Sequence, residues 1–357
     1  MAVPWALGKT GRCLSIVDME YDVRLGTVPH RGWRLRLRRG RISPNSIPEP
    51  RITPYNTNNS QNLTNASGSP QTMDCIINRR AQFSASHRYW LPELTEAENR
   101  DRFGRCANAP GHGHNYELFV SMAGQLDEYG MVLNLSDIKH DIKREVTEPL
   151  DFSFLNDVWP EFQQTLPTTE HIAKVIWQRL APHLPIVQIQ LFEHPDLWAD
   201  YYGNGNEVYL SLRTHFSAAH RLAIPGASDD ENDRLYGKCA RPYGHGHNYH
   251  LEVTVCGTMD DRTGMSVDLG ALTQLVEDRV AEPFDHTFLN ADIPYFAEST
   301  IVPTDENFAL HIRDLLEAPI AELGATLHKL KLIESPGNAC EVFGTAVVNP
   351  FPQLVIR

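Results

Sequence analysis

Polar and apolar positions alternate in several stretches of the chain, as they do in strands with one buried face. The clearest stretches are 209–220, "YLSLRTHFSAAH", and 249–257, "YHLEVTVCG". Two later stretches, 327–335 ("LHKLKLIES") and 340–348 ("CEVFGTAVV"), repeat the alternation and are rich in β-forming residues. The pattern therefore predicts four strands in this part of the chain.

Between the second and third of these strands, the apolar period lengthens to that of helices. Asp268 stands as an N-cap before Leu269, Leu272, Val276 and Val280, which share one helical face. Thr304 stands in the same way before Phe308, Ile312 and Leu315. The element order β-β-α-α-β-β predicts an α+β fold, an antiparallel sheet with two helices on one face.

The same order occurs twice, so the chain from residue 73 onward is an internal duplication. "FSASHR" (83–88) matches "FSAAHR" (216–221) at an offset of 133, and "LFEHP" (191–195) matches "LIESP" (332–336) at an offset of 141. We predict two tandem domains, 73–205 and 206–357, each with a four-stranded antiparallel sheet and two helices on one face. They are called copy 1 and copy 2 below.

Residues 1–72 differ in composition from both copies. Residues 1–50 carry nine Lys and Arg against four Asp and Glu, and residues 43–72 are mostly Asn, Ser, Thr, Gln, Pro and Gly. Such a segment cannot bury enough apolar surface to offset its chain entropy. We expect a disordered tail that is first basic and then Asn/Ser/Pro-rich.

The overall composition argues against nucleic acid and membranes as binding partners. The 357 residues carry a formal net charge of -13, which argues against nucleic acid, and contain no apolar run long enough to span a membrane. Six cysteines do not make a disulfide framework, and the first residues lack a signal-peptide core. We expect a cytoplasmic protein with reduced thiols that acts on a small molecule.

A cysteine and a His-x-His pair recur in both copies, as "CANAPGHGHNY" (106–116) and "CARPYGHGHNY" (239–249). Alternate strand residues share a face, so His245 and His247 lie side by side, and antiparallel pairing with the preceding strand brings His220 opposite them. Three imidazoles with a fourth position open are typical of catalytic zinc. The equivalent residues in copy 1 are His87, His112 and His114. We expect one Zn²⁺ in each domain.

These motifs, together with "DHTFLN", "PYFAEST" and "PTDEN", resemble 6-pyruvoyl-tetrahydropterin synthase, and next to it 6-carboxytetrahydropterin synthase, over nearly all of residues 73–346. The resemblance implies the tunnelling fold (T-fold), whose units close into rings around a β-barrel, and therefore a homo-oligomer. It also implies zinc and the substrate 7,8-dihydroneopterin triphosphate, which loses triphosphate to give 6-pyruvoyl-tetrahydropterin in tetrahydrobiopterin biosynthesis.

The resemblance also assigns roles in copy 2. Cys239 matches the family's catalytic cysteine, and Asp285 with His286 matches its Asp-His pair, in which a carboxylate orients an imidazole that relays protons. Glu334 matches the carboxylate that anchors the pterin edge through two parallel hydrogen bonds. Thr304 is expected to line the same pocket through its backbone at a helix start.

Copy 1 keeps the equivalents Cys106, Asp151 and Glu193, but Phe152 stands where the relay histidine is expected. A phenyl ring cannot carry a proton. We therefore expect copy 1 to bind zinc and pterin but to turn over poorly, and copy 2 to be complete. The alternative is that Asp285 and His286 serve a pocket whose zinc lies in copy 1, because the family's pockets lie between neighbouring subunits.

Two other functions remain open. One is 6-carboxy-5,6,7,8-tetrahydropterin synthase of queuosine biosynthesis, although the five residues between the cysteine and the His-x-His pair are more similar to the pyruvoyl enzymes. The other is a non-catalytic pterin-binding protein, which Phe152 favours for copy 1 and the complete residue set of copy 2 disfavours.

Overall fold

The computed structural model describes residues 75–347, so the tail predicted at 1–72 lies outside the described residues. The described chain forms a ten-stranded sheet in the order β10-β9-β7-β6-β5-β4-β2-β1-β3, and β8 pairs with β6 off this path. Helices accompany the sheet in each copy, which agrees with the predicted α+β class. None of the helices of residues 75–347 is long and apolar enough to cross a bilayer.

Copy 1 contributes four long strands and one short strand. Strands β1 (Cys75–His87), β2 (His112–Gly124), β4 (Ile186–His194) and β5 (Leu197–Tyr201) pair antiparallel in that order. The two-residue β3 (Ser153–Phe154) pairs parallel with the outer edge of β1.

Copy 2 repeats this arrangement. Strands β6 (Glu207–His220), β7 (His245–Thr258), β9 (Thr326–Ser335) and β10 (Asn338–Phe343) pair antiparallel, and β8 (Thr287–Phe288) pairs parallel with β6. The predicted last strand, 340–348, was placed too late. It starts at Asn338 because a two-residue turn is enough to bring it back onto β9, and it ends at Phe343, before Gly344.

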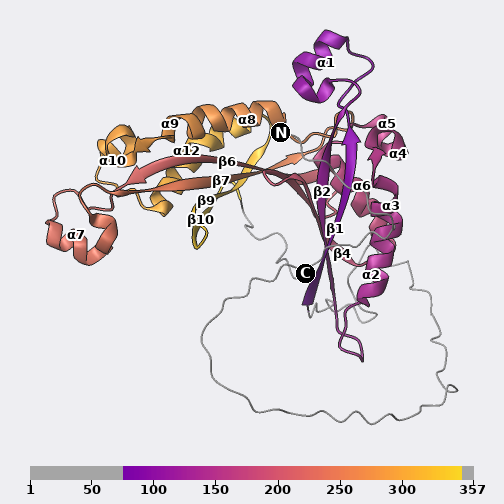
Figure 1. The fold of residues 1–357 in the computed structure, drawn as a ribbon, viewed down its shortest axis with the longest axis horizontal. Coiled ribbons are helices and arrows are strands. Elements are labelled where there is room, and N and C mark those ends of the chain that lie inside the picture. The colour runs from indigo at the N-terminus through magenta and orange to yellow at the C-terminus, as the bar shows by residue number, and fades with distance from the viewer. Residues whose placement is uncertain (1–74, 348–357) are drawn as a thin grey trace, which may run out of the picture. The chain divides into compact units, whose positions relative to one another are not determined.

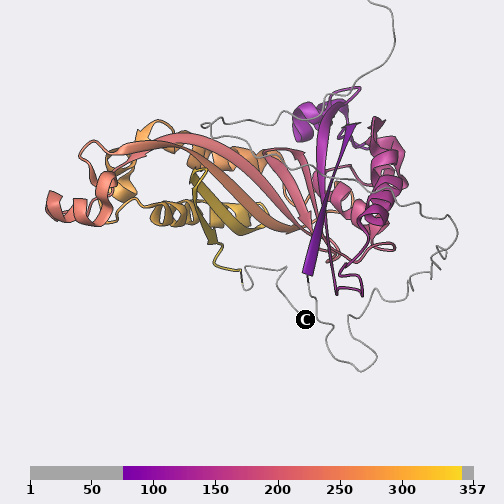
Figure 2. The ribbon, with the colours of Figure 1, turned by 60° about the horizontal axis from the view of Figure 1, so that its bottom comes forward.

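The two predicted helices are present in each copy. They are α2 (Leu135–Ile142) and α6 (Thr169–Leu180) in copy 1, and α8 (Leu269–Val276) and α12 (Asp305–Glu322) in copy 2. The predicted caps are confirmed, since the Asp268 side chain accepts from the Ala271 amide and the Thr304 side chain accepts from the Asn307 amide. In each copy these helices lie on one side of the strands (Figures 1 and 2).

Several shorter helices were not predicted. Helices α1 (Glu96–Phe103) and α7 (Asp229–Tyr236) each lead into a 3₁₀ turn, Gly104–Ala107 and Gly237–Ala240, that carries a cysteine. Their start signals are present, for Thr95 and Glu98 form a capping box. The other helical segments are π-turns at Lys143–Thr147 and Glu277–Ala281, α3 (Glu148–Leu150), α4 (Leu155–Val158), α5 (Pro160–Gln164), α9 (Glu282–Phe284), α10 (Leu289–Asp292) and α11 (Pro294–Ala297).

The two copies, each predicted to have a four-stranded sheet, join edge to edge in one continuous sheet. Strand β5 of copy 1 pairs antiparallel with β6 of copy 2, from Leu197 opposite Leu212 to Asp200 opposite Tyr209. This β5–β6 junction is called the seam. The predicted domain boundary at 205/206 falls in the turn between these strands, and the division into two domains there stays a prediction.

Candidate active site

The strand register gathers three histidines at the same place in each copy. His220 at the end of β6 is directly opposite His245 at the start of β7, and Ala218 is opposite His247. The pairing of β1 with β2 gives the equivalent arrangement, with His87 opposite His112. Since alternate residues share a face, each strand pair presents three imidazoles on one side.

The spacing of the ring nitrogens fits a tetrahedral metal site. The Nε2 atoms of His220 and His245 are 3.3 Å apart, and those of His87 and His112 are 3.1 Å apart. Metal–nitrogen bonds of about 2.0–2.1 Å at tetrahedral angles place two ligand nitrogens about 3.3 Å apart. In each copy the ligand atoms of all three histidines lie within 4.8 Å of one another.

Backbone contacts fix the tautomer of the innermost histidine. Nδ1 of His220 lies 2.8 Å from the Pro303 carbonyl and Nδ1 of His87 lies 3.0 Å from that of Pro167. A carbonyl only accepts, so each Nδ1 carries the proton and each Nε2 keeps a lone pair for a metal. Burial lowers the pKa of both imidazoles to about 4, which keeps them neutral near pH 7.

The third histidine of each set also fits a metal. Nε2 of His114 and Nε2 of His247 are buried and make no hydrogen bond within residues 75–347, although a glutamate oxygen lies 3.3 Å from the first and 3.1 Å from the second. A buried ring nitrogen that makes no hydrogen bond and faces two other imidazoles and a carboxylate is typical of a ligand position. The donor set suits zinc, which binds imidazole readily.

The predicted pterin anchors lie against these histidines. Glu334 Oε1 is 3.1 Å from His247 Nε2 and 3.6 Å from His220 Nε2. In copy 1, Glu193 Oε1 is 3.3 Å from His114 Nε2, and its Oε2 accepts from the Thr169 hydroxyl at 2.6 Å. A carboxylate therefore borders each histidine set. Glu334 is also close enough to His220, His245 and His247 to be a fourth metal ligand. The sequence analysis did not predict a carboxylate ligand.

A further carboxylate in copy 2 was missed. The Asn338 amide donates to Glu334 Oε2 at 2.7 Å and to Asp305 Oδ2 at 3.0 Å. Asp305 Oδ1 is buried and has no hydrogen-bond partner among the described residues. Burial and the neighbouring Glu334 raise the pKa of Asp305 to about 7. Comparing "PTDEN" with "PTTEH" could have singled it out, since Thr169 is the equivalent in copy 1.

The two cysteines occupy equivalent half-buried turns. The Cys239 carbonyl accepts from the Leu222 amide, and the Cys106 carbonyl accepts from the Tyr89 amide, both at 2.9 Å. These bonds tie each turn to the segment just after the innermost histidine of each set. Burial, and then the negative charge of Glu193, raise the pKa of the Cys106 thiol, so this thiol needs a nearby cation in order to ionise.

The Asp-His pair is formed as predicted. Asp285 Oδ2 lies 2.7 Å from His286 Nδ1, and Asp285 Oδ1 accepts from the Ser217 amide at 2.8 Å. These two hydrogen bonds lower the pKa of Asp285, so the carboxylate is ionised and can orient the imidazole. In copy 1, Asp151 Oδ1 accepts from the Ser84 amide in the same way.

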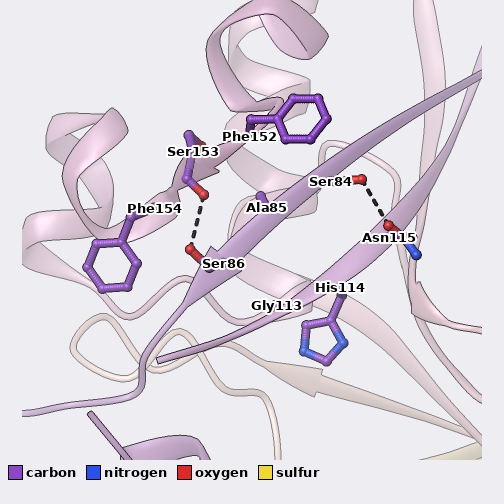
Figure 3. Close-up of a pocket in the computed structure, with 9 residues that line it drawn as sticks. All are labelled: Ser84, Ala85, Ser86, Gly113, His114, Asn115, Phe152, Ser153 and Phe154. Atoms are coloured by element: carbon purple, nitrogen blue, oxygen red, sulfur yellow. Dashed lines mark hydrogen bonds between the residues drawn. The ribbon is translucent and has the colours of Figure 1, made fainter. Parts of the chain in front are cut away.

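The side chain at the proton-relay position, Phe152 in copy 1 and His286 in copy 2, does not point toward the three histidines of its own copy. Figure 3 shows the Phe152 ring and the His114 ring on opposite sides of strands β1 and β2. Both residues line an open hollow of about 550 Å³. Phe152 is 89% exposed, and the His286 side chain is 82% exposed. Asp285 and His286 are thus brought together with each other, but they point outward at the edge of β6.

That edge of β6 is the one that faces copy 1. Strand β7 occupies the other edge over the whole length of β6, so β8 must share the outer edge with β5. The last seam hydrogen bond is from the Arg213 amide to the Asp196 carbonyl, and Ser217 contacts Asp285 four residues farther on. At about 3.3 Å per residue, the relay pair is about 13 Å along the edge from the β4–β5 turn of copy 1.

Comparisons with known proteins agree with the duplication. The family model described as 6-pyruvoyl tetrahydropterin synthase matches residues 76–204 and again 209–345. The 6-pyruvoyl tetrahydrobiopterin synthase of Homo sapiens is 43% identical over 136 residues, which are 38% of this chain and 91% of the relative. The 6-carboxy-5,6,7,8-tetrahydropterin synthase of Haemophilus influenzae is 31% identical over 121 residues, 28% of this chain and 84% of the relative. The solved structure of the Caenorhabditis elegans 6-pyruvoyl tetrahydropterin synthase is 34% identical and covers 40% of this chain and 98% of its own, with a TM-score of 0.37.

Proposed function

This chain belongs to the 6-pyruvoyl tetrahydropterin synthase family, and on that premise we propose that it is a zinc-dependent lyase. Its substrate is 7,8-dihydroneopterin triphosphate and its product 6-pyruvoyl-tetrahydropterin, formed with loss of triphosphate. The observation that carries the proposal is the pair of buried three-histidine sets, whose nitrogen spacing and fixed tautomers suit a zinc ion in each copy. When bound, zinc supplies a Lewis acid that acidifies C–H bonds next to the substrate's side-chain oxygens.

The chain's own residues supply binding and proton transfer. A carboxylate beside each histidine set, Glu193 or Glu334, accepts the two adjacent N–H groups of the pterin edge and so fixes the ring. A cysteine thiolate near the substrate side chain takes a proton from carbon. The imidazole of His286, held by Asp285 at 2.7 Å, passes protons to and from the reacting carbons.

We infer further that the competent pocket combines both copies. Asp285 and His286 lie on the edge of β6 that carries strand β5 of copy 1, and the exposed imidazole points away from its own strands. This placement favours the alternative in which the relay of copy 2 serves the histidines, Cys106 and Glu193 of copy 1. The histidines of copy 2 would then need a relay from another chain, where the equivalent residue is Phe152.

The 6-carboxy product is the second candidate, supported by the similarity to the Haemophilus influenzae enzyme, which is lower than that to the human enzyme. Incubation of the purified protein with zinc and 7,8-dihydroneopterin triphosphate, followed by mass spectrometry, tests the proposal. We expect 6-pyruvoyl-tetrahydropterin and triphosphate. Formation of 6-carboxytetrahydropterin and acetaldehyde would select the second candidate, and binding without turnover would indicate a pterin-binding protein.

A further inference from the structure

A second cavity lies on the other face of the sheet. On β6, Phe216 shares a face with His220, and its ring lies 5.9 Å from that of Phe308 in α12. Tyr209 and Ser211 alternate with these residues along the strand, so they project from the opposite face. They line a cavity of about 330 Å³ at the seam. This cavity is therefore separated by the sheet from the histidine set of copy 2.

A buried carboxylate lines this cavity. Asp200 of β5 is 8% exposed, and its hydrogen bonds come from the neutral side chains of Gln188, Gln190 and Trp198. Lys329 attracts it only from a distance, and it forms no ion pair among the described residues. Burial raises the pKa of Asp200 to about 6, so the carboxylate is still ionised at pH 7. The cavity thus contains a negative charge without a cationic partner.

Copy 2 has a cationic partner at the equivalent place. At the offset of 141, Asp200 corresponds to Glu341, and Gln188 and Gln190 correspond to Lys329 and Lys331. Both ammonium groups pair with Glu341, at 3.4 and 3.8 Å from its Oε1. Copy 1 therefore keeps the carboxylate but has neutral amides where copy 2 has two cations.

The charges around the cavity do not cancel. The carboxylates and cations of its lining are Asp200, Glu252, Glu341, Arg213 and Lys329. Arg213 donates to Glu252 through two nitrogens, at 3.1 and 2.5 Å, and Lys329 pairs with Glu341. Burial, and then Lys329, lower the pKa of His328, so this imidazole is neutral at pH 7. The lining therefore keeps one uncompensated negative charge, that of Asp200.

Aromatic rings lie around the carboxylate. Trp198 and Tyr202 are two residues before and after Asp200, and all three line the cavity. The Trp198 ring stacks on Phe192 with centroids 5.1 Å apart, and the Tyr202 ring lies 5.5 Å from that of Tyr209. Aromatic faces attract cations and also cover apolar groups. A carboxylate among such rings suits an organic cation better than a hydrated metal ion.

The aromatic lining is peculiar to the seam. The equivalent of Trp198 in copy 2 is Ala339, and the equivalent of Tyr209 in copy 1 is Ile76. The duplicated positions thus lack both the unpaired carboxylate and these two rings. One such cavity is expected in each chain.

We propose that this cavity binds a small organic ammonium ion, whose charged end pairs with Asp200 and whose apolar body lies among the aromatic rings. A carboxylate has about four acceptor sites, and three neutral donors leave room for an ammonium N–H. The volume of about 330 Å³ is at the lower end of the range for small-molecule pockets. Because the cavity is across the sheet from the histidines, its tests are independent of the proposed lyase activity.

The first test compares three probes of similar shape. Isothermal titration calorimetry of the purified full-length chain near pH 7 should show benzylammonium binding once per chain, with a Kd of about 1 mM or tighter. Benzyl alcohol and benzoate should bind at least about tenfold more weakly, because neither donates a charged hydrogen bond to the carboxylate. No benzylammonium binding, or equal binding of benzyl alcohol, overturns the proposal.

The second test assigns the binding to Asp200. Asp200→Asn should weaken benzylammonium binding by about tenfold or more, because it removes the charge and keeps the shape. Asp196→Asn removes one charge from the exposed turn before β5 and should leave the affinity unchanged. Equal effects of these two variants would place the cation elsewhere and overturn the proposal.

A third variant supplies the missing cation from the chain itself. Gln190→Lys reproduces the copy 2 arrangement, in which Lys331 pairs with Glu341. Its ammonium should occupy Asp200 and abolish benzylammonium binding, while Gln190→Met, of similar length and without charge, should retain it. Undiminished binding in Gln190→Lys would contradict the assignment to this carboxylate.

Discussion

Phe152 and His286 hold the same left-handed backbone conformation, with φ angles of 55° and 57°. Each donates its amide to a strand carbonyl at 2.6 Å, Phe152 to Ser84 and His286 to Ser217. Each follows an aspartate that accepts from the amide of the same serine. The turn is therefore conserved between the copies while the side chain that does chemistry is not.

Replacing either side chain by the other should change the catalytic rate without disturbing the fold. His286→Phe should lower kcat by about 10²- to 10⁴-fold, the usual contribution of a general acid or base. Phe152→His should raise the rate per chain by about twofold, because a second pocket gains its relay beside Asp151. Steady-state kinetics with unchanged zinc content measures both. Full activity in His286→Phe would remove the imidazole from the mechanism.

The two cysteines should differ in importance. If the competent pocket combines Cys106 with His286, Cys106→Ala should cost about 10²-fold or more in kcat, and Cys239→Ala should cost little. In a Phe152→His background, Cys239→Ala should cancel the gain. The reverse pattern, with Cys239 essential in the wild-type chain, would assign the relay to copy 2 alone.

The number of zinc ions bound per chain should fall by one when either histidine set is disrupted. Elemental analysis of the zinc-loaded protein should give two ions per chain, and His220→Ala or His87→Ala should each reduce this to one, because each set supplies all three imidazoles of its own site. His215→Ala is a suitable control, since His215 is an exposed histidine on the same strand as His220 and belongs to neither set. Loss of both ions in either variant would show that the sites are coupled.

The free energy of unfolding should depend on pH because the buried Asp200 at the seam titrates at a different pH in the folded and unfolded chain. Burial raises the pKa of Asp200 to about 6 from 3.8, even though the Gln188 and Gln190 amides donate to it at 2.7 and 2.9 Å. Between about pH 4 and pH 6 the folded chain thus holds this proton more tightly than the unfolded chain, so stability falls as pH rises through that window.

Asp200→Asn removes the charge and keeps an acceptor for the two amides. Denaturant unfolding at several pH values should show the variant gaining stability over the wild type as pH rises to about 6, by up to about 3 kcal/mol, and no further gain above that. Asp196→Asn, at an exposed position in the preceding turn, controls for the loss of one negative charge. A constant difference across this pH range would contradict the raised pKa.

The strands and histidine sets could be predicted because their signals are local. Alternation fixes which residues share a face, so His220, His245 and His247 follow from the sequence once two strands pair antiparallel. The helix starts at Asp268 and Thr304 follow from capping residues before apolar periods. Helix α1 was missed for the opposite reason, because its capping box precedes a mostly charged segment with no apolar stripe.

Features that depend on contacts between distant segments could not be predicted. The pairing of β5 with β6 depends on how two sheets meet, and no local pattern in Leu197–Tyr201 encodes its partner. The unusual position of Asp305 depends on Asn338 and Glu334, about thirty residues away. The position of His286 at the edge of β6 depends on the pairing of β8 with β6, which the sequence alone does not specify.

The covalent link across the seam gives the chain one pocket that dilution cannot take apart. The turn between β5 and β6 is a few residues long, so the effective concentration of copy 2 beside copy 1 is high at any protein level. A pocket that copy 2 formed with a second chain would have no such tether, and its occupancy would depend on protein concentration. Tandem fusion would therefore make the proposed pocket at the seam independent of protein concentration.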